Sequence, residues 1–439
     1  MSLTAAIVTL GCRLNQADSA LLTGRLRRMN IRPVAYTPAG ADIILINSCA
    51  VTATAARKSR QTVRQFRSRH PGAILVLTGC AADVDRTAVG EIAGIDLILT
   101  NEEKKNLEEK LGALLRLRGK DSELPAEKSP EAPPPPKEKN LFAERVFSEY
   151  PYKSRANLKV QEGCNNFCSY CIVPYARGRE RSRDFQETMD DFKRLLDAGF
   201  REIALTGINI CAYSCEGRRL PDLLEKLLTV PGDYRLRLGS TEPGEILMRV
   251  IDLMAEADGR ICEFLHPSLQ HGSDTILKAM NRHYLTGQYR EFVNYAREKV
   301  PRIHIGTDLI IGFPGETEEL FEESFAFVRS IGFSNMHLFP FSPRKGTRAA
   351  EMGPGISGDL VEKRLTRLHA LAEEMAERYR KTLIGSMQTV IPEKCGDDWG
   401  TGWSGSYVRT RVQRRGLRPG ELVRTRITGM DESGLLLGE

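Results

Sequence analysis

Three cysteines stand close together near the middle of the chain. Cys164, Cys168 and Cys171 are spaced C-x3-C-x2-C and come directly after a predicted strand. Thiolates are the usual ligands of iron–sulfur clusters, which normally take four of them. Zinc would also need a fourth ligand, and no His or Cys follows at a zinc-finger spacing. The segment therefore predicts a cubane iron–sulfur cluster with one iron left open for a non-protein ligand.

A second set of cysteines lies toward the start of the chain. Cys12, Cys49 and Cys80 each come just after a different apolar run that predicts a buried strand. Loops at the carboxyl ends of parallel strands converge on one crevice, so these thiols are expected to face one another there. We interpret them as ligands of a second cluster, and the alternative is a coincidence of three ordinary buried thiols. The remaining cysteines are expected to be core or surface thiols: Cys211, Cys215, Cys262 and Cys395.

The elements that must position this second set alternate along residues 1–118. Apolar runs predict strands at 6–10, 43–46, 74–77 and 95–99, and helices are expected near 15–29, 53–69, 84–92 and 103–117. Alternation of strand and helix favours a parallel sheet covered by helices on both faces. We therefore predict an α/β domain over residues 1–118.

The C-x3-C-x2-C segment belongs to a second strand–helix series that begins near residue 157. Its units fall short of the eight that close a full barrel, so an open, partial barrel is predicted for a domain spanning 141–384. Residues 119–140, rich in Pro, Lys and Glu, predict a linker between the two series. The expected strands are 158–161, 202–206, 235–238, 264–269, 304–310 and 336–339, and the expected helices lie near 186–198, 220–229, 244–257, 273–281, 287–299 and 316–331.

A small basic domain is predicted over residues 385–439, after a long amphipathic helix near 357–383. Runs at 388–391, 407–412, 422–427 and 434–437 are split by Gly and Asp, as in a small β-barrel. Between Tyr407 and Arg426 there are seven arginines against one Glu, a surplus equal to the net charge of +6 of the whole chain. Such a patch suits nucleic acid, as does the basic stretch 57–69, although a solvated basic face is the alternative.

The overall composition is that of a soluble globular protein, with 41% hydrophobic and 27% charged residues. No apolar run approaches the ~20 residues that a membrane span needs, and the start lacks the features of a signal peptide. We therefore expect a cytoplasmic protein without a membrane partner, whose cysteines are thiols or metal ligands rather than disulfides.

The segment from Cys164 to Cys171, after the first strand of a partial barrel, resembles the signature of the radical S-adenosylmethionine superfamily. The resemblance implies that the open iron binds S-adenosylmethionine, whose reductive cleavage yields a 5′-deoxyadenosyl radical. Thr206-Gly207 and residues 306–317 resemble later family segments beside the methionyl and adenosyl parts. The cofactor contacts implied in this way are Thr206, Gly207, Gln270, Thr307, Asp308 and Gly312.

Apart from the linker, the chain resembles the methylthiotransferase family within this superfamily. The resemblance is carried by residues 9–12 with Asn15, by 47–52, 78–80 and 269–274, by the Cys164 motif, and by a tail similar to the RNA-binding TRAM barrel. It implies a flavodoxin-like N-terminal sheet, two [4Fe–4S] clusters and two uses of S-adenosylmethionine: one methylates sulfur at the N-terminal cluster, the other makes the radical. A C–H bond of the substrate would become C–S–CH3, with electrons from an unidentified reductant.

Within this family the arginine-rich tail favours tRNA, modified at adenosine 37 of the anticodon loop, over a ribosomal protein. Residues 57–61, 176–183 and 342–347 look most like the branch acting on threonylcarbamoyladenosine, whose carboxylate gives arginines a role; the isopentenyladenosine branch is the nearest alternative. A non-enzymatic iron–sulfur RNA-binding sensor is a remote alternative, since it would not need the barrel. His271, Ser48 and Ala50 depart from the family pattern. His271 is expected to be a packed or water-bonded histidine, and contact with cofactor or substrate is the alternative. The residues expected to contact RNA are Arg177, Arg179, Arg181, Arg183, Arg409, Arg411, Arg414 and Arg415.

Overall fold

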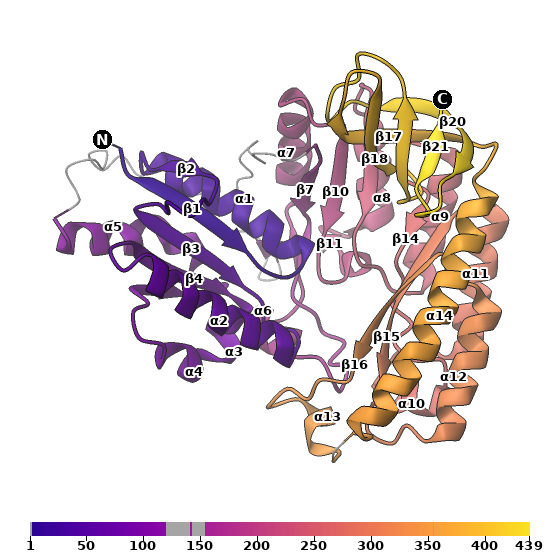
Figure 1. Cartoon of the computed structure of the whole chain (residues 1–439), viewed down its shortest axis with the longest axis horizontal. Coiled ribbons are helices and arrows are strands. Elements are labelled where there is room, and N and C mark those ends of the chain that lie inside the picture. Colours follow the sequence, from indigo (N-terminus) through magenta and orange to yellow (C-terminus); the bar gives the residue numbers. More distant parts are fainter. Residues whose placement is uncertain (1, 120–140, 143–153, 354) are drawn as a thin grey trace.

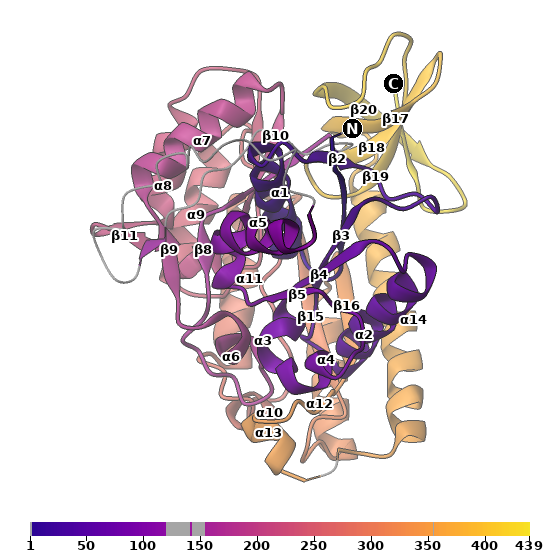
Figure 2. The same cartoon turned by 90° about the vertical axis from the view of Figure 1, so that its left-hand side faces the viewer.

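The computed structural model of the chain describes residues 2–119, 141–142, 154–353 and 355–439 (Figure 1). It contains an N-terminal sheet with helices, a central strand–helix series and a C-terminal β-barrel, so the predicted fold class is confirmed. Figure 2 shows the N-terminal part in front of the central strands, with the C-terminal barrel above. The linker predicted over 119–140 lies outside the described residues apart from Gly119, and the predicted domain limits stay predictions.

Five parallel strands form the N-terminal sheet in the order β2-β1-β3-β4-β5. This is the flavodoxin-like order, in which the switch point lies between β1 and β3. Successive residues of a strand face opposite sides of the sheet. In β3, Ile44 and Ile46 therefore pack on the α2 side, whereas Ile43 and Leu45 pack against α1 and α5. The elements are β1 (Thr4–Thr9), α1 (Arg13–Arg28), β2 (Arg32–Val34), β3 (Ile43–Ser48), α2 (Ala53–Arg69), β4 (Ile74–Gly79), α3 (Cys80–Val84), α4 (Arg86–Gly90), β5 (Leu97–Leu99), η1 (Glu103–Asn106) and α5 (Leu107–Leu117).

Two elements of this part differ from the prediction. The sequence did not indicate β2, an edge strand whose three residues are exposed or half-buried and carry no apolar run. The single helix expected near 84–92 is instead the two short helices α3 and α4, which meet at Asp85.

Six parallel strands form the central partial barrel, and all six were predicted. They occur as two groups, β13-β10-β7 and β14-β15-β16, which are bridged by the pairs Leu236–Ile261 and Thr241–Pro267. One continuous apolar core lies between the strands and the helices outside them. The elements are β7 (Ala156–Lys159), α7 (Phe185–Asp197), β10 (Glu202–Thr206), α8 (Leu220–Leu228), β13 (Arg235–Leu238), α9 (Glu245–Glu256), β14 (Phe264–Leu265), α10 (Asp274–Ala279), α11 (Thr286–Lys299), β15 (His304–Ile311), α12 (Glu318–Ile331), β16 (Asn335–Pro340) and α14 (Gly358–Thr382).

Short elements decorate the barrel, among them a small sheet in the order β6-β9-β8. No helix among the described residues is both long and apolar enough to cross a membrane. The short elements are β6 (Leu141–Phe142), β8 (Gln161–Glu162), α6 (Val173–Arg177), β9 (Arg181–Arg183), η2 (Ile210–Ala212), β11 (Ser214–Cys215), β12 (Arg218–Arg219) and α13 (Arg348–Glu351).

The C-terminal part is a closed five-stranded barrel in the order β17-β18-β19-β21-β20. Sequence analysis missed β18, whose glycines permit close approach: a Cβ on Gly402 would lie 1.7 Å from the Ile391 carbonyl oxygen. Arg235 and Arg237 anchor this barrel, because each donates to its backbone carbonyls and both pair with the buried Glu202. The strands are β17 (Met387–Cys395), β18 (Trp399–Ser404), β19 (Arg409–Gln413), β20 (Val423–Met430) and β21 (Leu436–Gly438).

Candidate active site

The loop that carries Cys164, Cys168 and Cys171 begins where the backbone turns sharply at Gly163. Gly163 has a φ of 71°, and a Cβ there would lie 2.0 Å from the Arg179 carbonyl oxygen. Only glycine fits this conformation and this close approach without displacing the facing segment between α6 and β9. The far end of the loop is held at Ser169, whose N–H donates to the Met280 carbonyl at 2.9 Å. The three thiols are thus held on one short, anchored segment.

The thiols of this loop are close enough to influence one another. Burial, followed by the neighbouring Cys168, raises the pKa of Cys171 to about 12. A buried guanidinium partly offsets this crowding, since Arg282 donates from Nη1 to the Cys168 Sγ at 3.2 Å. The N–H of Asn166 lies 3.5 Å from the Cys164 Sγ. Crowded thiols with N–H donors aimed at sulfur fit a cluster of several metal ions, whose potential such hydrogen bonds tune.

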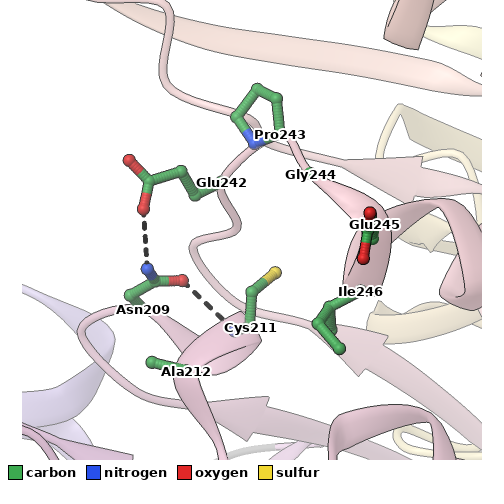
Figure 3. Close-up of a pocket in the computed structure, with 8 residues that line it drawn as sticks. All are labelled: Asn209, Cys211, Ala212, Glu242, Pro243, Gly244, Glu245 and Ile246. Atoms are coloured by element: carbon green, nitrogen blue, oxygen red, sulfur yellow. Dashed lines mark hydrogen bonds between the residues drawn. The ribbon is translucent and has the colours of Figure 1, made fainter. Parts of the chain in front are cut away.

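Glu242 ties this loop to the ends of the next strands. Its carboxylate accepts from Asn166 Nδ2 at 2.6 Å and from Asn209 Nδ2 at 2.9 Å, and it pairs with Arg282 at 3.0 Å. Glu242 and Asn209 also line a pocket of about 280 Å³ beside the loop (Figure 3). Cys211 points into this pocket, and Cys215 is fully buried in the apolar core, so neither extends the triad. That both are ordinary core or surface thiols stays a prediction.

The N-terminal thiols gather at the switch point of the sheet. Cys12 follows β1, Cys49 follows β3 and Cys80 begins α3 after β4, so parallel strands deliver all three to one edge. Asn15 links the ends of β1 and β3, because its side-chain amide donates to the Leu10 carbonyl at 2.7 Å and to the Ser48 carbonyl at 2.8 Å. The predicted convergence of the three strand ends is therefore present.

Electrostatics and packing fit this second triad to a cluster as well. Burial raises the pKa of Cys49 to about 11, and the neighbouring Cys80 and Cys12 add to the effect. A Cβ on Gly11 would lie 2.8 Å from the Cys49 Sγ, so the first loop folds directly over the second thiol. Three thiols gathered at one edge of a sheet suit the thiolate ligation of an iron–sulfur cluster.

The two triads are joined by a direct helix contact. Helix α6 begins two residues after Cys171, helix α3 begins at Cys80, and the two helices pack together, with Ala176 in the same apolar cluster as Cys80. Arg177 ends α6 and reaches into the N-terminal part, where its Nη2 donates to Asn15 Oδ1 at 2.5 Å. Its Nε has no hydrogen-bond partner among the described residues. Burial alone would lower the pKa of Arg177, but nearby Cys80 and two carboxylates hold it well above its ordinary value.

A buried ion network surrounds Arg177 at this junction. Asp18 of α1 accepts from Lys159 at 3.0 Å and from Lys104 at 2.7 Å, and pairs with Arg177 at 3.1 Å. Glu162 pairs with Arg177 at 2.8 Å. Burial opposes ionisation of Asp18, but the three cations hold its pKa well below the ordinary value. These charges fix the N-terminal sheet against the central barrel.

Two of the predicted cofactor contacts are glycines, and at both positions the backbone passes close to a neighbouring side chain. A Cβ on Gly207 would lie 2.9 Å from the Gln161 side chain, which accepts from the N–H groups of Ile208 and Asn209. Gly312 has a φ of 80° and donates to Glu316 at 2.9 Å. Gln270 has a φ of 70° and is paired through its backbone to β15, which places it beside that strand's carboxyl half. Thr206 is buried, and its hydroxyl bonds the Ala204 carbonyl.

Thr307 and Asp308 face opposite sides of β15. The Thr307 hydroxyl is buried on the helix side, where it accepts from the Leu269 N–H at 2.8 Å and donates to the Pro267 carbonyl at 3.0 Å. Asp308 faces the barrel interior, with one oxygen 3.0 Å from His266 Nε2 and 3.1 Å from His337 Nδ1. The Thr307 hydroxyl therefore supports the neighbouring backbone, and the cofactor contact expected at Thr307 stays a prediction.

Burial alone would raise the pKa of Asp308, but hydrogen bonds from the two histidines hold it below the ordinary value. Sequence reasoning missed His266, His337, Glu242 and Arg282. Of these four, only His266 stands directly after a strand, and that position was the one signal of a role. His271, in contrast, is a packed histidine as expected: it accepts from the Ser273 N–H at 3.1 Å and lies 3.4 Å from the buried Glu316.

The arginines predicted to contact RNA divide into buried and exposed groups. Arg177 is buried in ion pairs with Asp18 and Glu162. Arg183 is buried in an ion pair with Asp191. The prediction that these two arginines contact RNA is therefore wrong. A buried guanidinium that is paired with a carboxylate is shielded from solvent, so it cannot contact a phosphate group. The remaining six are exposed or half-buried: Arg179, Arg181, Arg409, Arg411, Arg414 and Arg415.

Two family descriptions match this chain. Residues 158–328, which cover the barrel with its cysteine loop, match the radical SAM superfamily. Residues 4–100, which carry the N-terminal triad, match the uncharacterized protein family UPF0004.

Curated relatives match nearly the whole chain. The threonylcarbamoyladenosine tRNA methylthiotransferase MtaB of Bacillus subtilis is 32% identical over 97% of this chain and 93% of its own length. The protein of the same name from Chlamydia pneumoniae is 33% identical over 99% of this chain and 97% of its own length. The tRNA-2-methylthio-N(6)-dimethylallyladenosine synthase of Clostridium botulinum is 32% identical over 88% of this chain and 85% of its own length.

Solved structures share the fold at low sequence identity. The radical S-adenosylmethionine methyltransferase TsrM of Kitasatospora setae superposes with a TM-score of 0.57 at 16% identity, covering 78% of this chain and 74% of its own. The cobalamin-dependent radical enzyme OxsB gives a TM-score of 0.53 at 13% identity, over 86% of this chain and 56% of its own. With a barrel and a sheet that each carry a cysteine triad, and with full-length relatives above 30% identity, the chain belongs to the methylthiotransferase family of radical S-adenosylmethionine enzymes.

Proposed function

We propose that this chain is a tRNA methylthiotransferase that converts N6-threonylcarbamoyladenosine at position 37 of the anticodon loop to its 2-methylthio derivative. The observation that carries the proposal is the junction of the two cysteine triads. Helices α6 and α3, which begin beside Cys171 and at Cys80, pack together, and Arg177 spans the junction. A reaction that needs both a radical source and a sulfur source requires this proximity.

The chain's own residues hold and orient the reacting groups. Cys164, Cys168 and Cys171 would hold one [4Fe–4S] cluster, and Cys12, Cys49 and Cys80 the other. When bound, these clusters and S-adenosylmethionine supply an electron, a radical, sulfur and a methyl group. Around them, Arg282 donates to a cluster thiol. A low-potential one-electron donor of unidentified kind is the reductant that this chemistry needs.

The substrate assignment rests on relatives and on the polarity of the barrel interior. The two relatives named for threonylcarbamoyladenosine span 97% and 99% of this chain. Inside the barrel, His266, Asp308 and His337 form a hydrogen-bonded polar group. A threonylcarbamoyl substituent has hydroxyl and carboxylate oxygens that can bond to such a group, whereas a dimethylallyl substituent has no hydrogen-bonding atom.

The C-terminal barrel provides the proposed RNA surface. Arg411, Arg414, Arg415 and Arg418 are exposed on β19 and the loop after it. Exposed arginines that neutralise phosphates position RNA without reading its sequence. We further propose a cytoplasmic location, which is supported by a tRNA substrate and by cysteines that serve as cluster ligands rather than disulfides.

Nucleoside mass spectrometry in a host stripped of its own methylthiotransferases tests this assignment. Expression of this chain should produce 2-methylthio-threonylcarbamoyladenosine, and the Cys49→Ala and Cys168→Ala variants should produce none. If 2-methylthio-dimethylallyladenosine appears instead, the substrate assignment is wrong and the alternative stands. If wild-type protein with full iron content yields neither nucleoside, the proposed tRNA activity is overturned.

A further inference from the structure

Three side chains from adjacent strands converge inside the barrel, apart from both cysteine triads. His266 follows β14, Asp308 lies in β15, and His337 lies opposite Asp308 in β16. One oxygen, Asp308 Oδ1, is 3.0 Å from His266 Nε2 and 3.1 Å from His337 Nδ1. One ligand atom from each of the three residues lies within 4.8 Å of the other two.

The surroundings orient each of the three groups. Ser268 donates to Asp308 Oδ2 at 2.8 Å, which leaves Oδ1 directed at the two imidazoles. A Cβ on Gly306 would lie 2.7 Å from His266 Nδ1, so that ring rests directly on the glycine. Asn335 Nδ2 lies 3.4 Å from His337 Nε2 and holds Nδ1 toward the carboxylate. Hydrogen bonds on the far side of two of the three ligands, and close packing against the third, are typical of metal sites.

The spacing and donor types match a coordination face. Metal bonds of about 2.1 Å at roughly 90–110° place neighbouring ligand atoms about 3.0–3.4 Å apart, the range in which both histidines stand from Asp308. Two imidazoles and one carboxylate are a common donor set for Zn²⁺, Fe²⁺ and Mn²⁺. The face is also open, because 52% of the His337 side chain and 27% of the Asp308 side chain are exposed.

We propose that His266, Asp308 and His337 bind one divalent transition-metal ion, and that the ion's open positions take oxygen atoms of the substrate's substituent. The second part rests on the proposed function, because a threonylcarbamoyl group offers carboxylate and hydroxyl oxygens. The metal site itself does not depend on which RNA is modified.

Mn²⁺ titration of the cluster-loaded protein, followed by the electron paramagnetic resonance of free Mn²⁺, tests the site without activity. Mn²⁺ suits the test because thiolates select softer metals. We expect one bound Mn²⁺ per chain, and a loss of affinity by more than about tenfold in Asp308→Asn and His337→Gln. The matched control is His283→Gln, at an exposed histidine outside the group, which should bind as wild type does.

Unchanged iron content and circular dichroism establish that the variants are folded. Absence of Mn²⁺ binding by wild-type protein, or equal binding by the folded variants, overturns the site. An anticodon stem-loop bearing threonylcarbamoyladenosine should then perturb the spectrum of bound Mn²⁺, whereas the unmodified stem-loop should not. If Mn²⁺ binds but neither RNA perturbs it, the metal site stands and the substrate contact is overturned.

Discussion

The guanidinium of Arg282 donates a hydrogen bond to the Sγ of Cys168 at 3.2 Å. Arg282 is held in place by Glu242 at 3.0 Å and by the Tyr284 hydroxyl at 2.8 Å. A buried cation beside a cluster thiolate stabilises the reduced, more negative cluster.

Replacing Arg282 with Gln should therefore lower the reduction potential of the barrel cluster by an amount on the order of tens of millivolts. The measurement is a redox titration followed by electron paramagnetic resonance, in protein whose N-terminal cysteines are replaced by Ala so that one cluster contributes. Arg290→Gln, an exposed substitution, is the control and should leave the potential unchanged. An unaltered potential in folded Arg282→Gln protein would show that the contact does not tune the cluster.

Asp18 compensates three buried cations, so its loss should destabilise the junction of the two triads. Asp18→Asn leaves Lys104, Lys159 and Arg177 with one carboxylate fewer. Breaking a buried ion network by removing one partner costs about 3–5 kcal/mol. Thermal unfolding should show a clearly lower Tm than for Asp397→Asn, at an exposed position. Equal Tm values for the two variants would contradict this role of Asp18.

Alanine substitutions at Gly163 and Gly178 should distinguish the effect of a steric clash from that of backbone strain. Both have positive φ, 71° and 74°, but a Cβ on Gly163 meets the Arg179 carbonyl at 2.0 Å, while a Cβ on Gly178 meets nothing within 4 Å. Gly163→Ala should therefore displace the cysteine loop and abolish iron binding by the barrel. Gly178→Ala should retain it at a cost of about 1–3 kcal/mol in stability, because φ 74° with ψ −165° is a conformation that side chains disfavour. Iron content in protein lacking the N-terminal cysteines measures both, and equal loading would refute the steric argument.

Asp83 should make stability depend on pH. Burial raises its pKa from the ordinary 3.8 to about 6, although hydrogen bonds from Asn101 oppose the shift. Between these values the folded state binds the extra proton, so this carboxyl's contribution to stability falls as pH rises toward 6 and then levels off. The Tm of Asp83→Asn relative to wild type should thus increase from pH 5 to pH 7. Asp258→Asn, at an exposed site, should show a constant difference, and a constant difference for Asp83→Asn would contradict the shift.

Exposed arginines of the C-terminal barrel should contribute more to RNA affinity when they are not held in an ion pair with a carboxylate. Arg411→Gln and Arg414→Gln should each weaken binding of any tRNA and reduce the salt slope of log K by about 1. Arg409→Gln is the matched control on the same strand, because Arg409 is paired with Glu393 at 2.8 Å and should contribute less. Fluorescence anisotropy over a salt series measures both quantities. Slopes that do not change would remove this face from the RNA-binding surface.

Much of this protein follows from local sequence. The C-x3-C-x2-C spacing places Cys164, Cys168 and Cys171 on one loop whatever surrounds it, and apolar runs define the strands that precede the cysteines. Because parallel strands bring their carboxyl ends to one edge, the meeting of Cys12, Cys49 and Cys80 also follows from their positions after strands. Patterns of this kind predicted all six barrel strands, but not β18, where close backbone approach requires glycine in place of a β-forming run.

Only the tertiary structure decided which charged residues are exposed to solvent and which are buried in ion pairs. Arg177 and Arg183 look like surface arginines in sequence, yet Asp18, Glu162 and Asp191 take them into buried ion pairs. The meeting of His266, Asp308 and His337 was likewise invisible, because residues far apart in the chain become neighbours only through the register of β14, β15 and β16. Local spacing specifies short-range chemistry, whereas burial and long-range pairing depend on how whole elements pack, and no short segment encodes that.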